Sequence, residues 1–261
     1  MKHHDEAVKR YIARVKDDPD VVAVVVSGSL ARGTERDDSD IDLYLVVTEE
    51  AWERAVAANR IMVVETEGAE YDRGYFDIKL ATLRFLREAA ERGDDPVRDS
   101  FASALVAWSS VPNLAERISR IGLRDAHSWQ SLEDSFLAQA RLHGGYFLHE
   151  GERGADALLL HHAAVHLATS ACRALLARNR VLFSGPKYLA RLVAGLKAAP
   201  ARWGDLLTDL LEHPSAASGD RLIAALEAFL GSPQTFEDSL SIFVTDNELA
   251  WRTRDPPPEY R

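Results

Sequence analysis

The chain has 261 residues, of which 46% are hydrophobic and 28% charged, and its formal net charge is -10. This composition is typical of a folded globular protein with one large domain or two modest ones. The negative charge disfavours a long nucleic-acid partner, because proteins that hold nucleic acid usually neutralise several phosphates with Lys and Arg. It suits a cationic or neutral small molecule better.

The sequence gives no sign of membrane insertion or export. No run of about 18 apolar residues occurs, and the first residues lack the apolar core of a signal peptide. Cys172 is the single cysteine, so no internal disulfide can form. We therefore expect a cytoplasmic protein with no membrane partner, while the oligomeric state stays open.

The first half alternates helical and strand patterns, which is typical of a mixed α/β domain. Apolar residues recur at helical spacing over 5–17, and the β-branched run 21–26 predicts a buried strand. The further predicted elements follow in chain order: strand 41–47, helix 49–59, strand 61–66, strand 75–80, helix 83–91, and a helix end and strand within 101–108.

The second half has apolar residues at three- and four-residue spacing and few strand signals, which predicts an all-α domain. Gly122 and Asp125 interrupt the pattern between the two halves. We therefore predict an α+β protein, with a mixed-sheet domain over 1–123 and a helical domain over 124–261. The helical pattern covers 129–149, 155–179, 186–198 and 220–230.

Two carboxylates stand at the beginning of the second predicted strand. Asp40 and Asp42 are two residues apart, so both side chains point to one face of the strand, and Ile41 and Leu43 point to the other. Two crowded carboxylates repel each other, and a divalent cation such as Mg²⁺ relieves that repulsion. Asp77 lies in a later alternating strand, and on a neighbouring strand it would join the same metal site.

The loop ahead of these carboxylates suits a phosphate. Gly28 and Ser29 follow the buried strand 21–26, and the next residues can open a helix. Glycine lets the backbone approach a ligand closely, and amides at a helix start favour an anion. Phosphate donors beside metal-binding carboxylates are what metal-assisted phosphoryl transfer requires.

The string GSLARGTERDDSDIDL, which begins at Gly28, resembles the signature of the DNA polymerase β-like nucleotidyltransferase superfamily. That signature has Gly-Ser, a spacer, Asp-x-Asp and a later strand carboxylate, and it covers roughly residues 21–80 here. The added helical half resembles, in layout, the bacterial antibiotic nucleotidyltransferases that act on aminoglycosides or lincosamides.

The resemblance implies a role for each matching residue. Gly28 and Ser29 would hold the triphosphate of a nucleotide, with ATP the usual donor. Asp40 and Asp42 would bind two Mg²⁺ ions, and Asp77 would bind one of them and assist as the general base. The α-phosphate would be attacked in line and pyrophosphate would leave.

Two cations are further candidates for the nucleotide site. Arg32 would approach the phosphates from the loop, or lie on the surface. Lys187, from the helical half, would contact phosphate or acceptor, or be a surface lysine at the start of a helix.

Several readings stay open at this stage. The acceptor would be a small molecule, of which an antibiotic is one option, or else a protein or tRNA end. A non-catalytic module that only binds nucleotide is the third reading. His162 and His166 are four residues apart on a helix, a spacing that suits zinc, but their apolar neighbours favour a place in the core or lining a cleft. Trp251 would close the cleft or simply pack.

Overall fold

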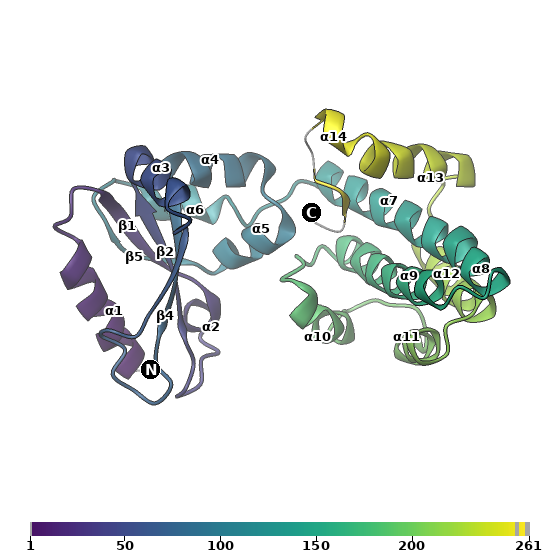
Figure 1. Cartoon of the computed structure of the whole chain (residues 1–261), viewed down its shortest axis with the longest axis horizontal. Coiled ribbons are helices and arrows are strands. Elements are labelled where there is room, and N and C mark those ends of the chain that lie inside the picture. Colours follow the sequence, from purple (N-terminus) through teal and green to yellow (C-terminus); the bar gives the residue numbers. More distant parts are fainter. Residues whose placement is uncertain (1, 254–255, 259–261) are drawn as a thin grey trace. The chain divides into compact units, whose positions relative to one another are not determined.

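The computed structural model describes residues 2–253 and 256–258 of the chain. The chain divides into two compact units, Met1–Leu123 and Arg124–Arg261, and each is described on its own (Figure 1). The first contains a mixed sheet and the second only helices, which confirms the predicted α+β class. In the part of the chain described, no helix combines the length and the apolar character needed to cross a membrane.

The first unit is built on a five-stranded sheet with the order β3-β4-β2-β1-β5. Strands β2 and β4 pair in parallel, and all other pairs are antiparallel. The sheet is therefore mixed, as the sequence predicts. The strands are β1 (Val21–Val26), β2 (Ile41–Val47), β3 (Met62–Glu65), β4 (Phe76–Thr82) and β5 (Leu105–Ser109).

Helices cover both faces of this sheet, which explains why its central strands are apolar on both sides. Helix α1 (Lys2–Val15) packs on the face that carries Ile41 and Leu43, both almost fully buried. On the other face, α4 (Leu83–Arg92), α5 (Asp95–Ala102) and α6 (Leu114–Ser119) cover Tyr44 and Val46. The short helices α2 (Gly28–Arg32) and α3 (Glu49–Ala57) follow β1 and β2.

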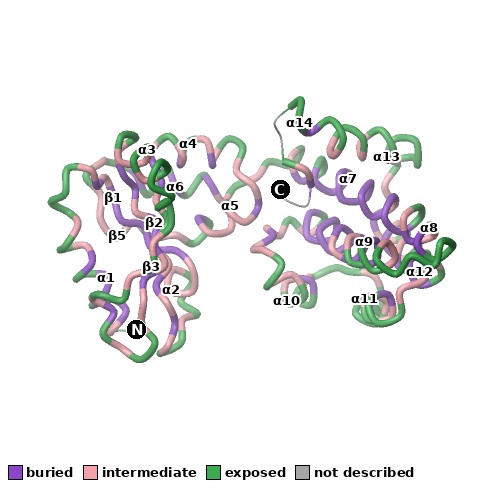
Figure 2. The backbone as a smooth tube through the Cα atoms, in the orientation of Figure 1, coloured by how far each residue is buried: buried purple, intermediate pink, exposed green. Residues whose placement is uncertain are grey.

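The second unit is arranged around two long helices, α7 (Ala126–Leu142) and α9 (Ala157–Arg178). Figure 2 shows buried segments running along both. The remaining elements, with η for 3₁₀ or π turns, are η1 (His143–Phe147), α8 (Leu148–Arg153), η2 (Pro186–Tyr188), α10 (Leu189–Ala194), α11 (Trp203–Glu212), α12 (Ala216–Leu230), α13 (Phe236–Phe243), η3 (Val244–Glu248) and α14 (Ala250–Thr253).

The predicted helix over 186–198 was too long. Only Leu189–Ala194 is α-helical, after the 3₁₀ turn at Pro186–Tyr188, and Gly195 ends it. The amphipathic spacing continues past Gly195, but glycine is a poor helix former and favours helix ends.

An ion pair between a buried glutamate and a partly exposed arginine ties the long helices of the second unit together. Glu133 on α7 is nearly fully buried. Arg178, at the end of α9, donates a hydrogen bond to each carboxylate oxygen of Glu133, both at 2.6 Å. Arg178 also donates to the backbone oxygen of Leu230 on α12 at 2.6 Å. The carboxylate therefore depends on one guanidinium for its charge partner.

Substitution of Arg178 by Met is expected to destabilise the helical unit strongly, because it leaves a buried carboxylate without its counter-charge. Loss of one partner of such a pair costs about 3–5 kcal/mol. Arg202→Met is the matched control, since Arg202 pairs with Asp205 on the surface and exposed pairs contribute about 0–1 kcal/mol. Urea denaturation followed by circular dichroism measures both, and equal losses would contradict the assignment.

Candidate active site

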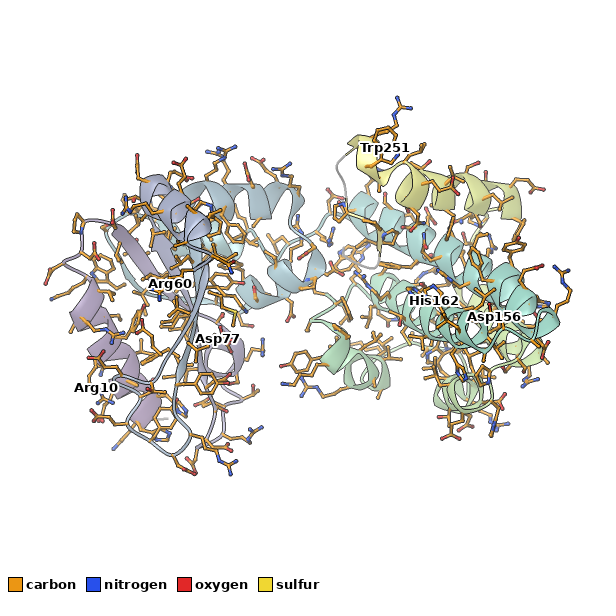
Figure 3. All side chains as sticks on the ribbon, viewed as in Figure 1. Arg10, Arg60, Asp77, Asp156, His162 and Trp251 are labelled. Carbon is orange, nitrogen blue, oxygen red and sulfur yellow. The ribbon has the colours of Figure 1, made fainter. Side chains whose placement is uncertain are left out.

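The three aspartates predicted from sequence converge at one end of the sheet. Strands β2 and β4 lie side by side in parallel, and their register places Asp42 opposite Asp77. Asp40 comes just before β2. One carboxylate oxygen from each of the three lies within 4.8 Å of the others, and all three side chains are partly exposed. Figure 3 marks Asp77 on this sheet.

Strand geometry explains why the carboxylates share a face. Side chains alternate along a strand, so Asp40, Asp42 and Tyr44 fall on one side of β2. That side is the one covered by α4, α5 and α6, and Ile41 and Leu43 anchor the other side in the core beneath α1. The carboxylates stand where β2 and β4 begin.

The turn after β1 brings the backbone against this cluster. Gly28 has φ +64°, and a Cβ atom there would lie 1.8 Å from Oδ2 of Asp42. The Ser27 backbone N–H donates to the Asp42 backbone oxygen at 2.9 Å, which fixes the turn to β2. Glycine is required here for its conformation and for its missing side chain. Ser29 follows at the start of α2, whose first amides lack helical partners.

Burial, together with charge repulsion within the cluster, raises the pKa of Asp42. Burial is the largest cause, and the negative charge of Asp40 comes next. Asp77 adds to the rise in pKa, while Lys79 and Arg32 oppose it. A bound cation would relieve the crowding that raises this pKa.

The carboxylate oxygens are suitable ligands for such a cation. Oδ1 of Asp77 is buried and has no hydrogen-bond partner among the described residues. A buried acceptor without a donor is costly, and a metal ion is one means of satisfying it. Hard oxygen donors from three carboxylates are the ligand type that Mg²⁺ prefers.

Tyr75 is a site residue that the sequence reasoning missed. Its hydroxyl donates to Oδ2 of Asp40 at 3.0 Å, and this hydrogen bond is the main reason that the pKa of Tyr75 is raised. Tyr75 is two residues before Asp77, so the alternation that singled out Asp77 also places Tyr75 on the same side.

The two cations predicted for the nucleotide site, Arg32 and Lys187, differ in their surroundings. Arg32 lies close enough to lower the pKa of Asp42, and its guanidinium is 4.0 Å from Oδ2 of Asp99 on α5. Lys187 is exposed in the other unit, with its ammonium 5.5 Å from the centre of the Tyr188 ring. The role of Lys187 in the nucleotide site therefore stays a prediction.

Comparison with known proteins agrees with this geometry. Residues 9–84 match the family model described as "Polymerase beta, Nucleotidyltransferase", and this range contains the Gly28 turn and all three aspartates. The first unit therefore carries a nucleotidyltransferase domain. This domain, which contains residues 9–84, is of the DNA polymerase β-like nucleotidyltransferase superfamily.

Among solved structures, the chain is similar to a nucleotidyltransferase-like protein from Exiguobacterium sibiricum 255-15. The two share 13% sequence identity with a TM-score of 0.48, over 94% of this chain and 80% of that one. No curated protein matches the chain.

The Gly28 turn allows a sharp test of the cluster. Gly28→Ala is expected to displace the Asp42 carboxylate and abolish any thermal stabilisation by Mg²⁺. Gly33→Ala is the control, because Gly33 has nearly the same φ, +65°, but open space where its Cβ would be. In both variants alanine adopts a left-handed backbone conformation, which costs about 1–2 kcal/mol. Only Gly28→Ala also places a Cβ atom against the Asp42 carboxylate. Differential scanning fluorimetry with and without Mg²⁺ compares them, and a full Mg²⁺ shift in Gly28→Ala would contradict the geometry.

The raised pKa of Asp42 predicts a pH-dependent cost to folding. Because the folded chain holds this proton more tightly than the unfolded chain, Asp42 supports folding below its ordinary pKa of 3.8, and this support is lost as the pH rises through the folded pKa. In EDTA at pH 7, Asp42→Asn should melt at a higher temperature than the unsubstituted protein, and the difference should shrink at pH 4. Calorimetry at both pH values tests this, and a lower melting temperature for the variant at pH 7 would refute it.

Proposed function

We propose that this chain transfers a nucleotidyl group, AMP from ATP, to a hydroxyl group of a small molecule and releases pyrophosphate. The observation that supports this most directly is the meeting of three carboxylates beside the Gly28 turn. Carboxylates that repel each other next to backbone amides form a site for a polyanion bridged by metal ions.

Each residue of the cluster has a distinct part in the proposal. Asp40 and Asp42 would hold two Mg²⁺ ions, and Asp77 would share one of them through the oxygen that lacks a hydrogen-bond partner. When bound, these ions would neutralise the phosphates and stabilise the charge that develops on the leaving pyrophosphate. Tyr75 positions Asp40 by its hydrogen bond, so that the Asp40 carboxylate keeps a fixed orientation.

In the proposal, Asp77 and the Gly28 turn have further parts, in removing the proton of the acceptor hydroxyl and in positioning the triphosphate. Asp77 would accept the proton of the acceptor hydroxyl, or lower its pKa together with the metal. The amide and hydroxyl groups of Ser29, and the close backbone at Gly28, would hold the triphosphate. Arg32 is a further cation near Asp42, and we propose that it steadies the phosphates.

The acceptor is proposed to be small rather than polymeric. The chain carries 31 Lys and Arg against 41 Asp and Glu, so its overall charge repels a polynucleotide. We propose the helical unit as the acceptor-binding part, with Lys187 as its contact to phosphate or acceptor. Antibiotics with a free hydroxyl are one class of such acceptors.

Replacement of the aspartates tests the proposed chemistry. Asp40→Ala should abolish Mg²⁺-dependent binding of ATP, measured by calorimetry with Mg²⁺ and with EDTA. Asp77→Asn should retain part of the nucleotide affinity but release pyrophosphate at least about 10²-fold more slowly when small hydroxyl compounds are supplied, since general base catalysis contributes about 10²–10⁴-fold.

Asp37→Asn is the matched control for both substitutions, because Asp37 is an exposed acid of the same loop that lies outside the cluster. It should bind ATP and release pyrophosphate like the unsubstituted protein. If Asp40→Ala bound ATP with unchanged Mg²⁺ dependence, the proposed metal site would be wrong.

A further inference from the structure

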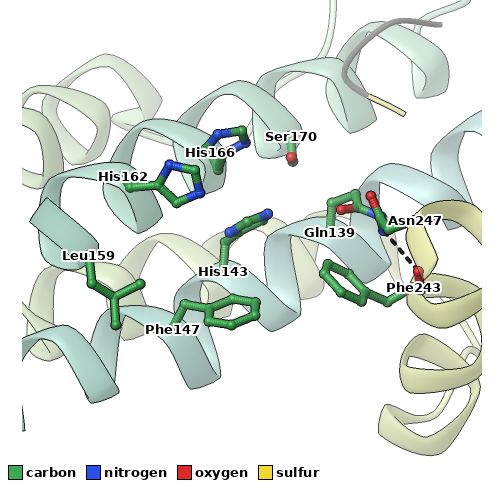
Figure 4. A pocket seen from close by; sticks show the side chains of 9 residues that line it. All are labelled: Gln139, His143, Phe147, Leu159, His162, His166, Ser170, Phe243 and Asn247. Carbon is green, nitrogen blue, oxygen red and sulfur yellow. Dashed lines mark hydrogen bonds between the residues drawn. The ribbon is translucent and has the colours of Figure 1, made fainter. Parts of the chain in front are cut away.

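The helical unit contains a cavity of about 470 Å³ within its own helices. Its walls come from α7, η1, α9 and the segment from α13 into η3, as Figure 4 shows. His162 and His166 lie on its α9 side, which agrees with the prediction that they line a cleft. A volume of this size is in the range of small-molecule sites.

Three imidazole rings meet at this cavity. The ring of His143 lies 4.7 Å from that of His166, nearly parallel to it, and 6.0 Å from that of His162. The three do not make a metal site, because the aspartate cluster is the single group of three potential metal ligands found in residues 2–253 and 256–258. The zinc reading of His162 and His166 therefore has no geometric support.

Two π-helical turns contribute to the cavity walls, and such turns are often found at functional sites. The first, η1, carries His143 and Phe147, which face the cavity four residues apart. Gly144 in the same turn packs closely on α12, since a Cβ atom there would lie 2.3 Å from Cδ1 of Ile223 and would require that side chain to move. The second, η3, carries Asn247, whose side chain donates to the Phe243 backbone oxygen at 2.8 Å.

Two buried polar atoms at this cavity lack hydrogen-bond partners among the described residues. They are Nε2 of Gln139, in a residue 5% exposed, and Nδ1 of His143, in a residue 9% exposed. An unpaired buried polar group destabilises a fold, so such groups at a cavity indicate a ligand that satisfies them. The Gln139 nitrogen is a donor and requires an acceptor on the ligand.

The cavity walls carry no formal charge near neutral pH on the side of α7 and η1. Burial lowers the pKa of His143 to about 3, with smaller contributions from His166 and His162, so its imidazole is neutral. None of the nine lining residues is Asp, Glu, Lys or Arg. A charged ligand would lose its hydration here without gaining a counter-charge.

We propose that this cavity binds an uncharged, planar aromatic molecule with a carboxamide or lactam edge. The ring lies against the aromatic side chains of His143, Phe147 and Phe243. The carbonyl oxygen accepts a hydrogen bond from Nε2 of Gln139, and the neighbouring N–H group meets Nδ1 of His143. The site lies within the helical unit, so the proposal does not depend on nucleotidyl transfer.

Three probes of the same shape and different charge test the proposal on the full chain: 2-naphthamide, the anion 2-naphthoate and the cation 2-naphthamidine. Calorimetry or saturation-transfer NMR at pH 7.5 should show binding of the amide at least about 10-fold tighter than either ion. The resonances of the Gln139 side-chain amide should shift when the amide probe is added. Equal binding of all three probes, or none, would overturn the proposal.

Substitution of Gln139 by Met separates recognition from packing. It should weaken 2-naphthamide binding by about 10-fold or more, the effect of about 1.4 kcal/mol. It should also raise the melting temperature, because the unpaired amide is removed from the interior. Gln130→Met is the control, since Gln130 is exposed on the same helix and bonds Asp134. Unchanged binding by Gln139→Met, or equal weakening by Gln130→Met, would overturn the proposal.

Discussion

The parallel pairing of β2 and β4 is the constraint on which the active site depends. It places Asp42 opposite Asp77 by backbone register, whatever the two side chains prefer. Like charges side by side on neighbouring strands destabilise a sheet. The arrangement persists because both faces of the same strands are buried under helices, with Ile41 and Phe76 fully enclosed on one face and Val46 and Ala81 on the other. The core thus holds the carboxylates close together, and a bound cation would relieve their mutual repulsion.

The turn at Gly28 follows from the same constraint. Because β1 pairs with β2, the chain leaving β1 passes directly over the Asp42 side chain. Only a residue without a side chain fits between backbone and carboxylate, and the positive φ then directs the chain into α2. The amides of the turn and the carboxylates are therefore adjacent because of the strand order, and their spacing in sequence reflects the length of the loop between two paired strands.

Much of this site could be predicted because patterns among residues close together in the sequence indicate it. The alternation around Asp42 assigns its side chain to the opposite face from Ile41 and Leu43, and the β-branched run 21–26 marks a central strand. The neighbour relation of Asp77 depends on strand order, which no local pattern contains, so the prediction rested on a family resemblance. Tyr75 was missed because a tyrosine at the start of a strand is equally typical of packing.

The cavity of the helical unit shows a different limit of sequence reasoning. His143 was not singled out, because the helical pattern continues through it and nothing local indicates the π turn that follows. A π turn shifts the side chains after it around the helix axis relative to regular α spacing. The ring of His143 lies 4.7 Å from that of His166 and 6.0 Å from that of His162, although His143 belongs to a different helical segment.

The net charge of the chain says little about the charge of a ligand inside the helical unit, and the ion pairs of that unit explain why. Several of its acids are matched with arginines at short range, which reduces the field that these acids contribute to a nearby cavity. Examples are Glu133 with Arg178 at 2.6 Å, Glu227 with Arg141 at 2.7 Å and Asp205 with Arg202 at 2.8 Å. The acids without such partners that matter for chemistry are the three aspartates of the first unit, which are crowded together. The net negative charge thus suits the proposed metal site, while the ligand proposed for the cavity among α7, α9 and α13 would be selected by shape and hydrogen bonding.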